Sequence, residues 1–138
     1  MDIDARGPRF GAAVSTVVLA VVLITGSAWL LAWQTLAFAL GAAGGVSRSP
    51  YGLLFRKAVR PRIGPPTEFE PPEPPRFAQA VGLLFAGLGL VGYTVGPLWL
   101  GLAATGAALA AAFLNAAFGY CLGCEMYLLI RRIAVRTE

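Results

Sequence analysis

The chain has 138 residues, of which 57% are hydrophobic and 13% charged, and its formal net charge is +4. Soluble domains carry roughly 25% charged residues. Two stretches, 10–47 and 77–124, contain no charged side chain. A soluble chain of this length could not bury so much apolar surface, so the composition excludes a soluble domain and predicts an integral membrane protein in the lipid bilayer. Basic residues that flank membrane spans are ordinary topology signals, so we expect no nucleic-acid partner.

The first uncharged stretch is long enough for two membrane spans, because about 20 helical residues cross a hydrocarbon core of roughly 30 Å. We predict helices over 10–31 and 35–55. The turn between them is expected at 29–34, a segment with two tryptophans and a glutamine. Tryptophan favours the membrane interface.

The second uncharged stretch repeats this plan. We predict helices over 77–93 and 98–130, with a turn at 94–99, where glycine, proline and tryptophan occur together. An unbroken fourth helix would be roughly 50 Å long, which exceeds one bilayer core, so Gly119 and Gly123 are the expected places for a bend. The predicted fold class is all-α, integral membrane, with four transmembrane helices.

The segment between the two halves, 56–75, is rich in proline. Proline disfavours α-helix, so we predict an extended, polyproline-type linker on the surface. The halves themselves resemble each other: Pro-Arg-Phe occurs at 8–10 and again at 75–77, and each half closes with a tyrosine followed by leucines and two basic residues. This pattern predicts two tandem helical hairpins that form parallel repeats.

The distribution of charge predicts the orientation in the membrane. All eleven basic residues lie before residue 10, between 48 and 76, or after 130, and neither predicted turn carries one. Because positively charged segments stay on the cytoplasmic side, we expect the N-terminus, the linker and the C-terminus to face the cytoplasm.

Cys121-Leu-Gly-Cys124 is the one recognisable chemical motif, and the chain has no other cysteine. Residues three apart share a helix face, so the two thiols could meet and exchange disulfides. Such a pair is activated at a helix N-terminus, but here we expect it near the C-terminal end of a helix. Two alternatives stay open: both cysteines pack as small apolar residues, or two chains together complete a metal site. The chain has no histidine and offers few ligands, so we expect neither a metal nor a cofactor.

Three polar residues are further candidates. Glu125 follows the thiols and is the sole acid of the second apolar half. Arg48 would lie inside the membrane edge if the second helix reached residue 55, and Glu125 would then be its natural partner; otherwise Arg48 extends to water. Asn115 is the most deeply placed strong polar side chain and is expected to bridge neighbouring helices.

Small residues predict close packing of the helices. Gly41-x-x-x-Gly45 and Gly92-x-x-x-Gly96 are accompanied by many alanines. Such faces favour tight helix contacts and a homo-oligomer, and they leave little room for a wide pore.

Four segments carry a family resemblance: 4–10, 50–56, 74–82 and 115–127, the last including Cys-Leu-Gly-Cys-Glu. On these segments the chain resembles a family of small bacterial membrane proteins, common in actinobacteria, that is catalogued as a domain of unknown function. The resemblance implies a bacterial cytoplasmic membrane and no established activity. Relatives encoded near thioredoxin-like and sulfurtransferase-like proteins imply a partner of that kind. Many relatives have histidine at the position of Ser49.

Two functional hypotheses follow. The preferred one is a membrane partner in thiol redox or sulfur handling, in which Cys121 and Cys124 form a dithiol/disulfide pair. The alternative is a non-catalytic membrane subunit, or a small-solute permease lined by the second and fourth helices, in which Arg48, Asn115 and Glu125 would matter. Whether the chain is an enzyme stays open, although few acid/base constellations can be built without histidine.

Overall fold

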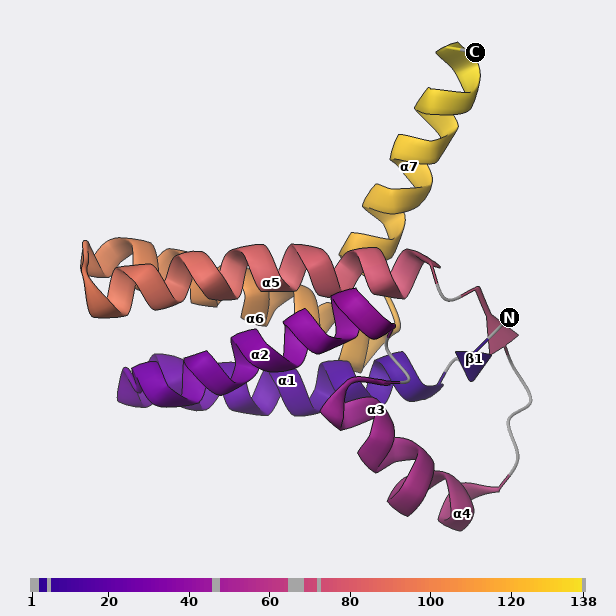
Figure 1. Cartoon of the computed structure of the whole chain (residues 1–138), viewed down its shortest axis with the longest axis horizontal. Helices are drawn as coiled ribbons and strands as arrows, with labels where there is room; N and C mark the ends of the chain where they lie inside the picture. Colours follow the sequence, from indigo (N-terminus) through magenta and orange to yellow (C-terminus); the bar gives the residue numbers. More distant parts are fainter. Residues whose placement is uncertain (1–2, 5, 46–47, 65–68, 72, 138) are drawn as a thin grey trace.

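The computed structural model of the chain describes residues 3–4, 6–45, 48–64, 69–71 and 73–137. It is helical apart from one short antiparallel pair of strands (Figure 1). The elements in chain order are β1 (Ile3–Asp4), α1 (Arg6–Thr25), α2 (Ala28–Gly44), α3 (Pro50–Leu54), the π-helical turn η2 (Phe55–Val59), α4 (Arg60–Ile63), β2 (Phe69–Glu70), α5 (Glu73–Thr94), α6 (Leu98–Phe118) and α7 (Leu122–Thr137).

The helices α1, α2, α5 and α6 form a bundle, from one end of which α7 and the α3–α4 segment project in opposite directions (Figure 1). We call this the basic end, and we call the end formed by the turns at 26–27 and 95–97 the turn end. Within the described residues, three helices, α1, α5 and α6, are long and apolar enough to cross a membrane. By this measure the structure shows three of the four predicted spans, because α2 is apolar but has only 17 residues.

The first turn lies nearer the N-terminus than predicted. Gly26 adopts a left-handed backbone with φ +69°, and the Ser27 side chain accepts a hydrogen bond from the backbone N–H of Leu30 (3.2 Å), which starts α2. Gln34, which suggested the turn at 29–34, is instead fully buried within α2. Its amide donates to Ser15 Oγ (2.9 Å) and accepts from the Tyr51 hydroxyl (2.7 Å), so the bundle interior satisfies this polar group.

The second helix ends at Gly44 rather than at residue 55, because Gly45 has φ +92°. A separate helix then starts at Pro50, where the Ser49 side chain accepts from the N–H of Gly52 (3.1 Å). Ser49 therefore acts as a helix N-cap in the place where relatives are expected to carry histidine.

The predicted extended linker also differs from the structure, which is helical over 56–63. Pro61 lies in the first turn of α4, where a missing N–H costs little. The turn before it widens, and the Arg60 N–H bonds to the Phe55 carbonyl five residues back. Prolines are likewise accommodated in the first turn of α5, which begins at Glu73. Positions 65–68 and 72 of the linker lie outside the described residues.

The last predicted helix, 98–130, is two helices. Gly119 has φ +69° and caps α6, with its N–H bonded to the Asn115 carbonyl (3.0 Å). A left-handed glycine at this position terminates a helix, so the chain turns and α7 starts in a new direction (Figure 1).

Each helix of one hairpin packs mainly on the other hairpin: α1 lies against α6, and α2 against α5. A buried apolar cluster fills the centre and consists of Leu19, Val22, Leu31, Phe38, Ala86 and Ala108. Gly92 approaches the backbone of Gly101 so closely that no side chain would fit between α5 and α6. Gly41 packs on Gln79, and Gly45 and Gly96 lie where helices end. The glycines of the two small-residue motifs thus serve contacts and turns within the chain.

The two Pro-Arg-Phe segments make reciprocal contacts. Arg9 Nη2 donates to the Ala116 carbonyl near the end of α6 (3.2 Å). Arg76 donates from Nε to the Ala42 carbonyl (2.7 Å) and from Nη2 to the Ala43 carbonyl (2.6 Å), near the end of α2. Each arginine therefore binds the free carbonyls at the end of a helix from the other half, where a cation is favourable.

The phenylalanines of the same segments also behave alike. Phe10 packs on Phe55, with ring centroids 5.7 Å apart, and Phe77 packs on Tyr127 at 5.6 Å. Each phenylalanine thus contacts an aromatic ring of the segment that closes its own half. The cysteine motif lies at the start of α7, the segment that closes the second half.

Candidate functional site

The candidate site lies where α6 passes into α7, at the basic end of the bundle. Cys121 and Cys124 are joined by a disulfide, with their Cα atoms 5.1 Å apart. The sequence prediction placed this pair near the C-terminal end of a helix. The structure places it at the N-terminus of α7, because Gly119 has already ended α6.

Cys121 makes two hydrogen bonds with backbone N–H groups of the first turn of α7, one through its sulfur and one through its carbonyl. The N–H of Cys124 donates to Cys121 Sγ (3.1 Å), and the Cys121 carbonyl accepts from the N–H of Glu125 (3.0 Å). Cys121 is thus the N-cap of α7. Once the disulfide is reduced, the positive end of the helix dipole and this N–H group favour a thiolate on Cys121. Cys121 is therefore the thiol best placed to act as nucleophile.

A cleft of about 440 Å³ opens beside the disulfide. Its walls include both cysteines, Glu125 in the first turn of α7, Asn115 in the last turn of α6 and Arg9 from the start of α1. The Arg9 guanidinium lies over Gly119, with Cζ 3.7 Å from the position that a Cβ would take. An arginine in the same cleft adds a further cation that favours a thiolate.

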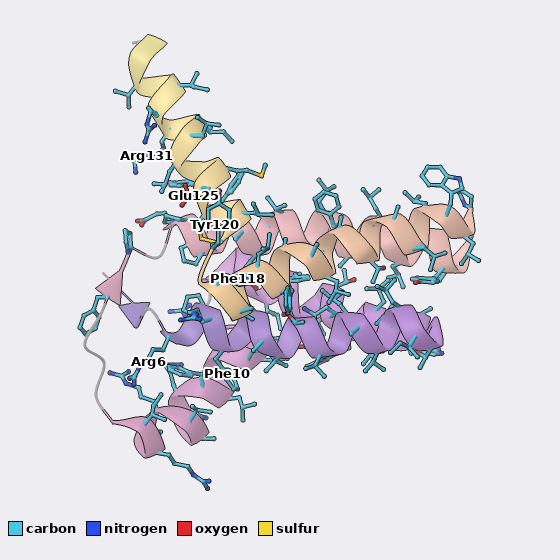
Figure 2. The ribbon with its side chains drawn as sticks, turned by 180° about the vertical axis from the view of Figure 1, so that it is seen from behind. Arg6, Phe10, Phe118, Tyr120, Glu125 and Arg131 are labelled. Atoms are coloured by element: carbon cyan, nitrogen blue, oxygen red, sulfur yellow. A yellow bond between two sulfur atoms is a disulfide. The ribbon has the colours of Figure 1, made fainter. Side chains whose placement is uncertain are left out.

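Helix α7 is held at this angle by a close contact with α5. Gly123 is buried, and a Cβ on it would lie 2.6 Å from the Cα of Ala78. The ring pair of Phe77 and Tyr127 continues the contact one turn further along. Figure 2 shows Phe118 and Tyr120 at the junction and Glu125 and Arg131 along α7. The position of the disulfide therefore depends on a glycine that lets α7 touch α5.

A second, largely apolar cavity of about 300 Å³ lies on the inner side of the motif, within the bundle. Cys121 and Asn115 line both this cavity and the outer cleft. Phe38 of α2, Phe85 of α5 and alanines of α6 supply most of the apolar wall, and Gln79 of α5 supplies a second amide. The motif thus lies between the outer cleft, which is the more polar of the two spaces, and the largely apolar inner cavity.

Of the three predicted polar residues, two lie in the cleft beside the cysteines, and Arg48 does not line it. Asn115 and Glu125 lie in the cleft, Asn115 half-buried and Glu125 exposed. Arg48 is exposed between α2 and α3, and within the described part of the chain no ion pair joins it to Glu125. The Asn115 side chain makes no hydrogen bond to another described residue, so the expected bridge between helices is not made there.

Arg9 is the residue that sequence reasoning missed at this site. The sequence analysis used Arg9 only as one of the basic residues that predict the orientation of the chain in the membrane. The signal that could have found it is the repeated Pro-Arg-Phe segment, since a repeated arginine next to an apolar span suggests a structural partner in each half. Among the described residues, no group of three or more histidine, cysteine or acidic side chains gathers to hold a metal ion.

Comparison with known families gives one match over nearly the whole chain. The model of a domain of unknown function, DUF4395, matches residues 3–132, a range that includes both cysteines. No curated protein and no solved structure matches the chain. The chain therefore belongs to the DUF4395 family, whose members contain this domain of unknown function.

Proposed function

We propose that this protein is a membrane-embedded thiol–disulfide exchanger whose working pair is Cys121 and Cys124. The observation that carries the proposal is the disulfide at the N-terminus of α7, with the Cys124 N–H donating to Cys121 Sγ. This arrangement stabilises one thiolate selectively, which is what exchange requires of an attacking or leaving sulfur. Structural packing of two cysteines requires neither the helix start nor the open cleft.

The exchange runs in two steps. In the reduced protein, the Cys121 thiolate attacks a disulfide of the partner, forms a mixed disulfide and releases one partner sulfur, which takes up a proton. The Cys124 thiolate then attacks Cys121 Sγ, closes the internal disulfide and releases the second partner thiol. The protein pair loses two electrons and the partner disulfide gains them. The reverse sequence reduces the internal disulfide with a partner dithiol.

The partner we propose is a soluble thioredoxin-like or sulfurtransferase-like protein on the cytoplasmic side. Support comes from the cleft, which lies at the basic end together with α7 and its Arg131 and Arg132. Positive segments stay cytoplasmic, so the thiols would face a compartment that contains such carriers. The membrane would be the bacterial cytoplasmic membrane.

We further propose that α2 completes a bundle of four spans made of two parallel hairpin repeats. Its 17 residues extend about 25 Å, close to the thickness of a bilayer core. It packs along α5 inside the same bundle as α1 and α6. The reciprocal bonds of Arg9 and Arg76 support the repeat.

The alternative is a non-catalytic membrane subunit or a small-solute permease lined by the second and fourth helices. Of its three polar residues, Asn115 and Glu125 line the cleft and Arg48 does not. Leu31 and Phe38 of α2 and Ala108 of α6 are buried in one apolar cluster. A solute path between these helices would need polar or water-accessible lining.

Trapping the mixed disulfide tests the proposal. Cys124→Ser leaves Cys121 able to attack but leaves no thiol to resolve the product, so membranes of this variant should accumulate a covalent, reductant-sensitive complex with a soluble thiol protein. Cys121→Ser is the matched control and should form little of it. Equal complexes from both variants, or none from either in cells where the wild-type pair cycles between oxidised and reduced forms, would contradict the assignment of Cys121.

A further inference from the structure

The inner cavity contains features that simple packing does not explain. It lies among α1, α2, α5 and α6, and its wall is mostly phenylalanine, alanine and other apolar residues. Two amides, Gln79 and Asn115, also line it, and neither makes a hydrogen bond to another described residue. Both amides are half-buried, so part of each faces the open space of the cavity. A half-buried amide that borders an apolar space can bond to a ligand there without breaking a hydrogen bond within the protein.

The cavity also touches the redox pair. Cys121 lies in its wall next to Asn115, while Cys124 lines only the outer cleft. The volume of about 300 Å³ falls at the lower end of small-molecule sites and suits one substituted ring. Ala107, which also lines the cavity, is exposed on the outer surface of α6, so the space reaches the apolar face of the bundle.

We propose that this cavity binds the ring of a lipid-soluble quinone, which exchanges two electrons with the Cys121–Cys124 pair. A quinone ring is apolar across its faces and carries two carbonyl oxygens at its edges. An amide donates to such a carbonyl through its NH₂ group and, after reduction, accepts from the hydroxyl through its oxygen. Gln79 and Asn115 therefore suit both redox states, whereas a lipid acyl chain would leave both amides unpaired.

The reaction balances without another reagent. The two thiols lose two electrons and two protons as the disulfide forms, and the quinone gains both and leaves as the hydroquinone. The proposal rests on the proposed function, because the electrons come from a partner dithiol that first reduces the disulfide. The motif would then pass electrons from a soluble carrier in the outer cleft to a membrane carrier in the inner cavity.

The test uses the full-length protein in detergent, with decylubiquinone as the probe. Binding is measured by equilibrium dialysis on the disulfide form, which cannot reduce the probe. Oxidation is measured without oxygen on the reduced form, from the loss of quinone absorbance and of free thiols. Exchange with a soluble peptide disulfide is measured separately and reports on the proposed function alone.

The variants fill or alter the cavity without touching the cysteines. Ala111→Leu places bulk in the cavity, and Ala110→Leu, which is exposed and does not line it, is the matched control. Ala111→Leu should weaken binding and slow oxidation by about tenfold or more, while Ala110→Leu and peptide exchange stay unchanged. Asn115→Leu and Gln79→Leu should each weaken binding by roughly three- to tenfold.

The outcomes separate the two proposals. Normal peptide exchange with no saturable quinone binding overturns the quinone site and leaves the exchange function standing. Oxidation that is equal in wild type, Ala111→Leu and Ala110→Leu also overturns it, because the quinone then reacts from outside the cavity. Saturable binding that Ala111→Leu removes, with thiols that neither exchange nor oxidise, overturns both the exchange function and the electron transfer to the quinone and leaves the cavity as a binding site alone.

Discussion

At the scale of single residues, Arg9 and Arg76 make the same kind of hydrogen bond but lie in different surroundings. Arg9 and Arg76 both donate to carbonyls at the end of a helix from the other half. Only Arg9 also lies in the cleft beside the disulfide. Arg9 therefore differs from Arg76 in lying close to thiols, because α7 carries two cysteines and the α3–α4 segment carries none.

This pair of residues gives a controlled prediction. In a Cys124→Ser background, Arg9→Gln should slow alkylation of Cys121 at neutral pH by roughly two- to fivefold, since the thiolate loses a nearby cation that solvent partly screens. Arg76→Gln removes a similar helix-end contact and should leave the alkylation rate unchanged. The measurement is the rate with iodoacetamide as a function of pH.

The pH dependence identifies the cause. Because Arg9 acts on the fraction of thiolate, the two rates should converge at high pH, where Cys121 is fully ionised with or without the cation. A difference that persists at high pH would mean that Arg9→Gln has changed access to the thiol. An equal slowing in Arg76→Gln would attribute the effect to a general loosening of the bundle.

At the scale of elements, glycines decide where helices end and how closely they approach. Gly119 ends α6 and so creates the helix start at which Cys121 lies, and Gly123 lets α7 contact α5. Within the second hairpin, Gly92 meets the backbone of Gly101. Gly87, on the same helix, has open space where its Cβ would be.

Substitution by alanine should change stability differently at Gly92 and at Gly87, both in α5. Gly92→Ala forces α5 and α6 apart, and we expect the free energy of unfolding to fall by about 1–3 kcal/mol. Gly87→Ala adds a methyl group in open space within the helix and should leave this free energy unchanged or raise it by up to about 1 kcal/mol. Denaturant unfolding in mixed micelles measures both values. A similar loss in the two variants would show that helix flexibility, rather than close approach, sets the effect.

At the scale of the whole molecule, the charged segments that the structure describes gather at one end of the bundle. The N-terminus of α1, the α3–α4 segment, the start of α5 and α7 lie at the basic end (Figure 1), and the turn end carries the strongly exposed Trp29 and Trp99. Exposed tryptophan suits a membrane interface, and exposed basic residues suit the cytoplasmic face.

Labelling of single cysteines tests both the orientation and the number of spans. In a Cys121→Ser, Cys124→Ser background, Ser27→Cys and Val95→Cys at the turn end should react with a membrane-impermeant maleimide in intact cells. Arg62→Cys in α4 should react only after the membrane is opened. If α2 does not cross the membrane, Arg62→Cys would instead label from outside together with Ser27→Cys.

The sequence by itself determined the environment of the chain and its chemical motif. Long uncharged stretches predicted helices apolar enough to cross a membrane, and the clustering of basic residues predicted that the two ends of these helices differ in charge. Glycine and proline predicted the turn between α5 and α6. The Cys-x-x-Cys spacing predicted that the two thiols could form a disulfide. These features are local, so they need no knowledge of which helix packs on which.

Tertiary structure decided the features that depend on contacts between distant residues. Gln34 was predicted to lie in a turn, yet it is buried in the bundle, where Ser15 and Tyr51 form hydrogen bonds with its amide. A bend at Gly119 or Gly123 was predicted and the chain does turn at Gly119, but the cysteines were predicted near the C-terminal end of a helix. The break at Gly119 and the contact of Gly123 with Ala78 instead place them at the start of α7. Because a helix dipole reverses its effect on a thiol between its two ends, that single break changed the expected chemistry of the site.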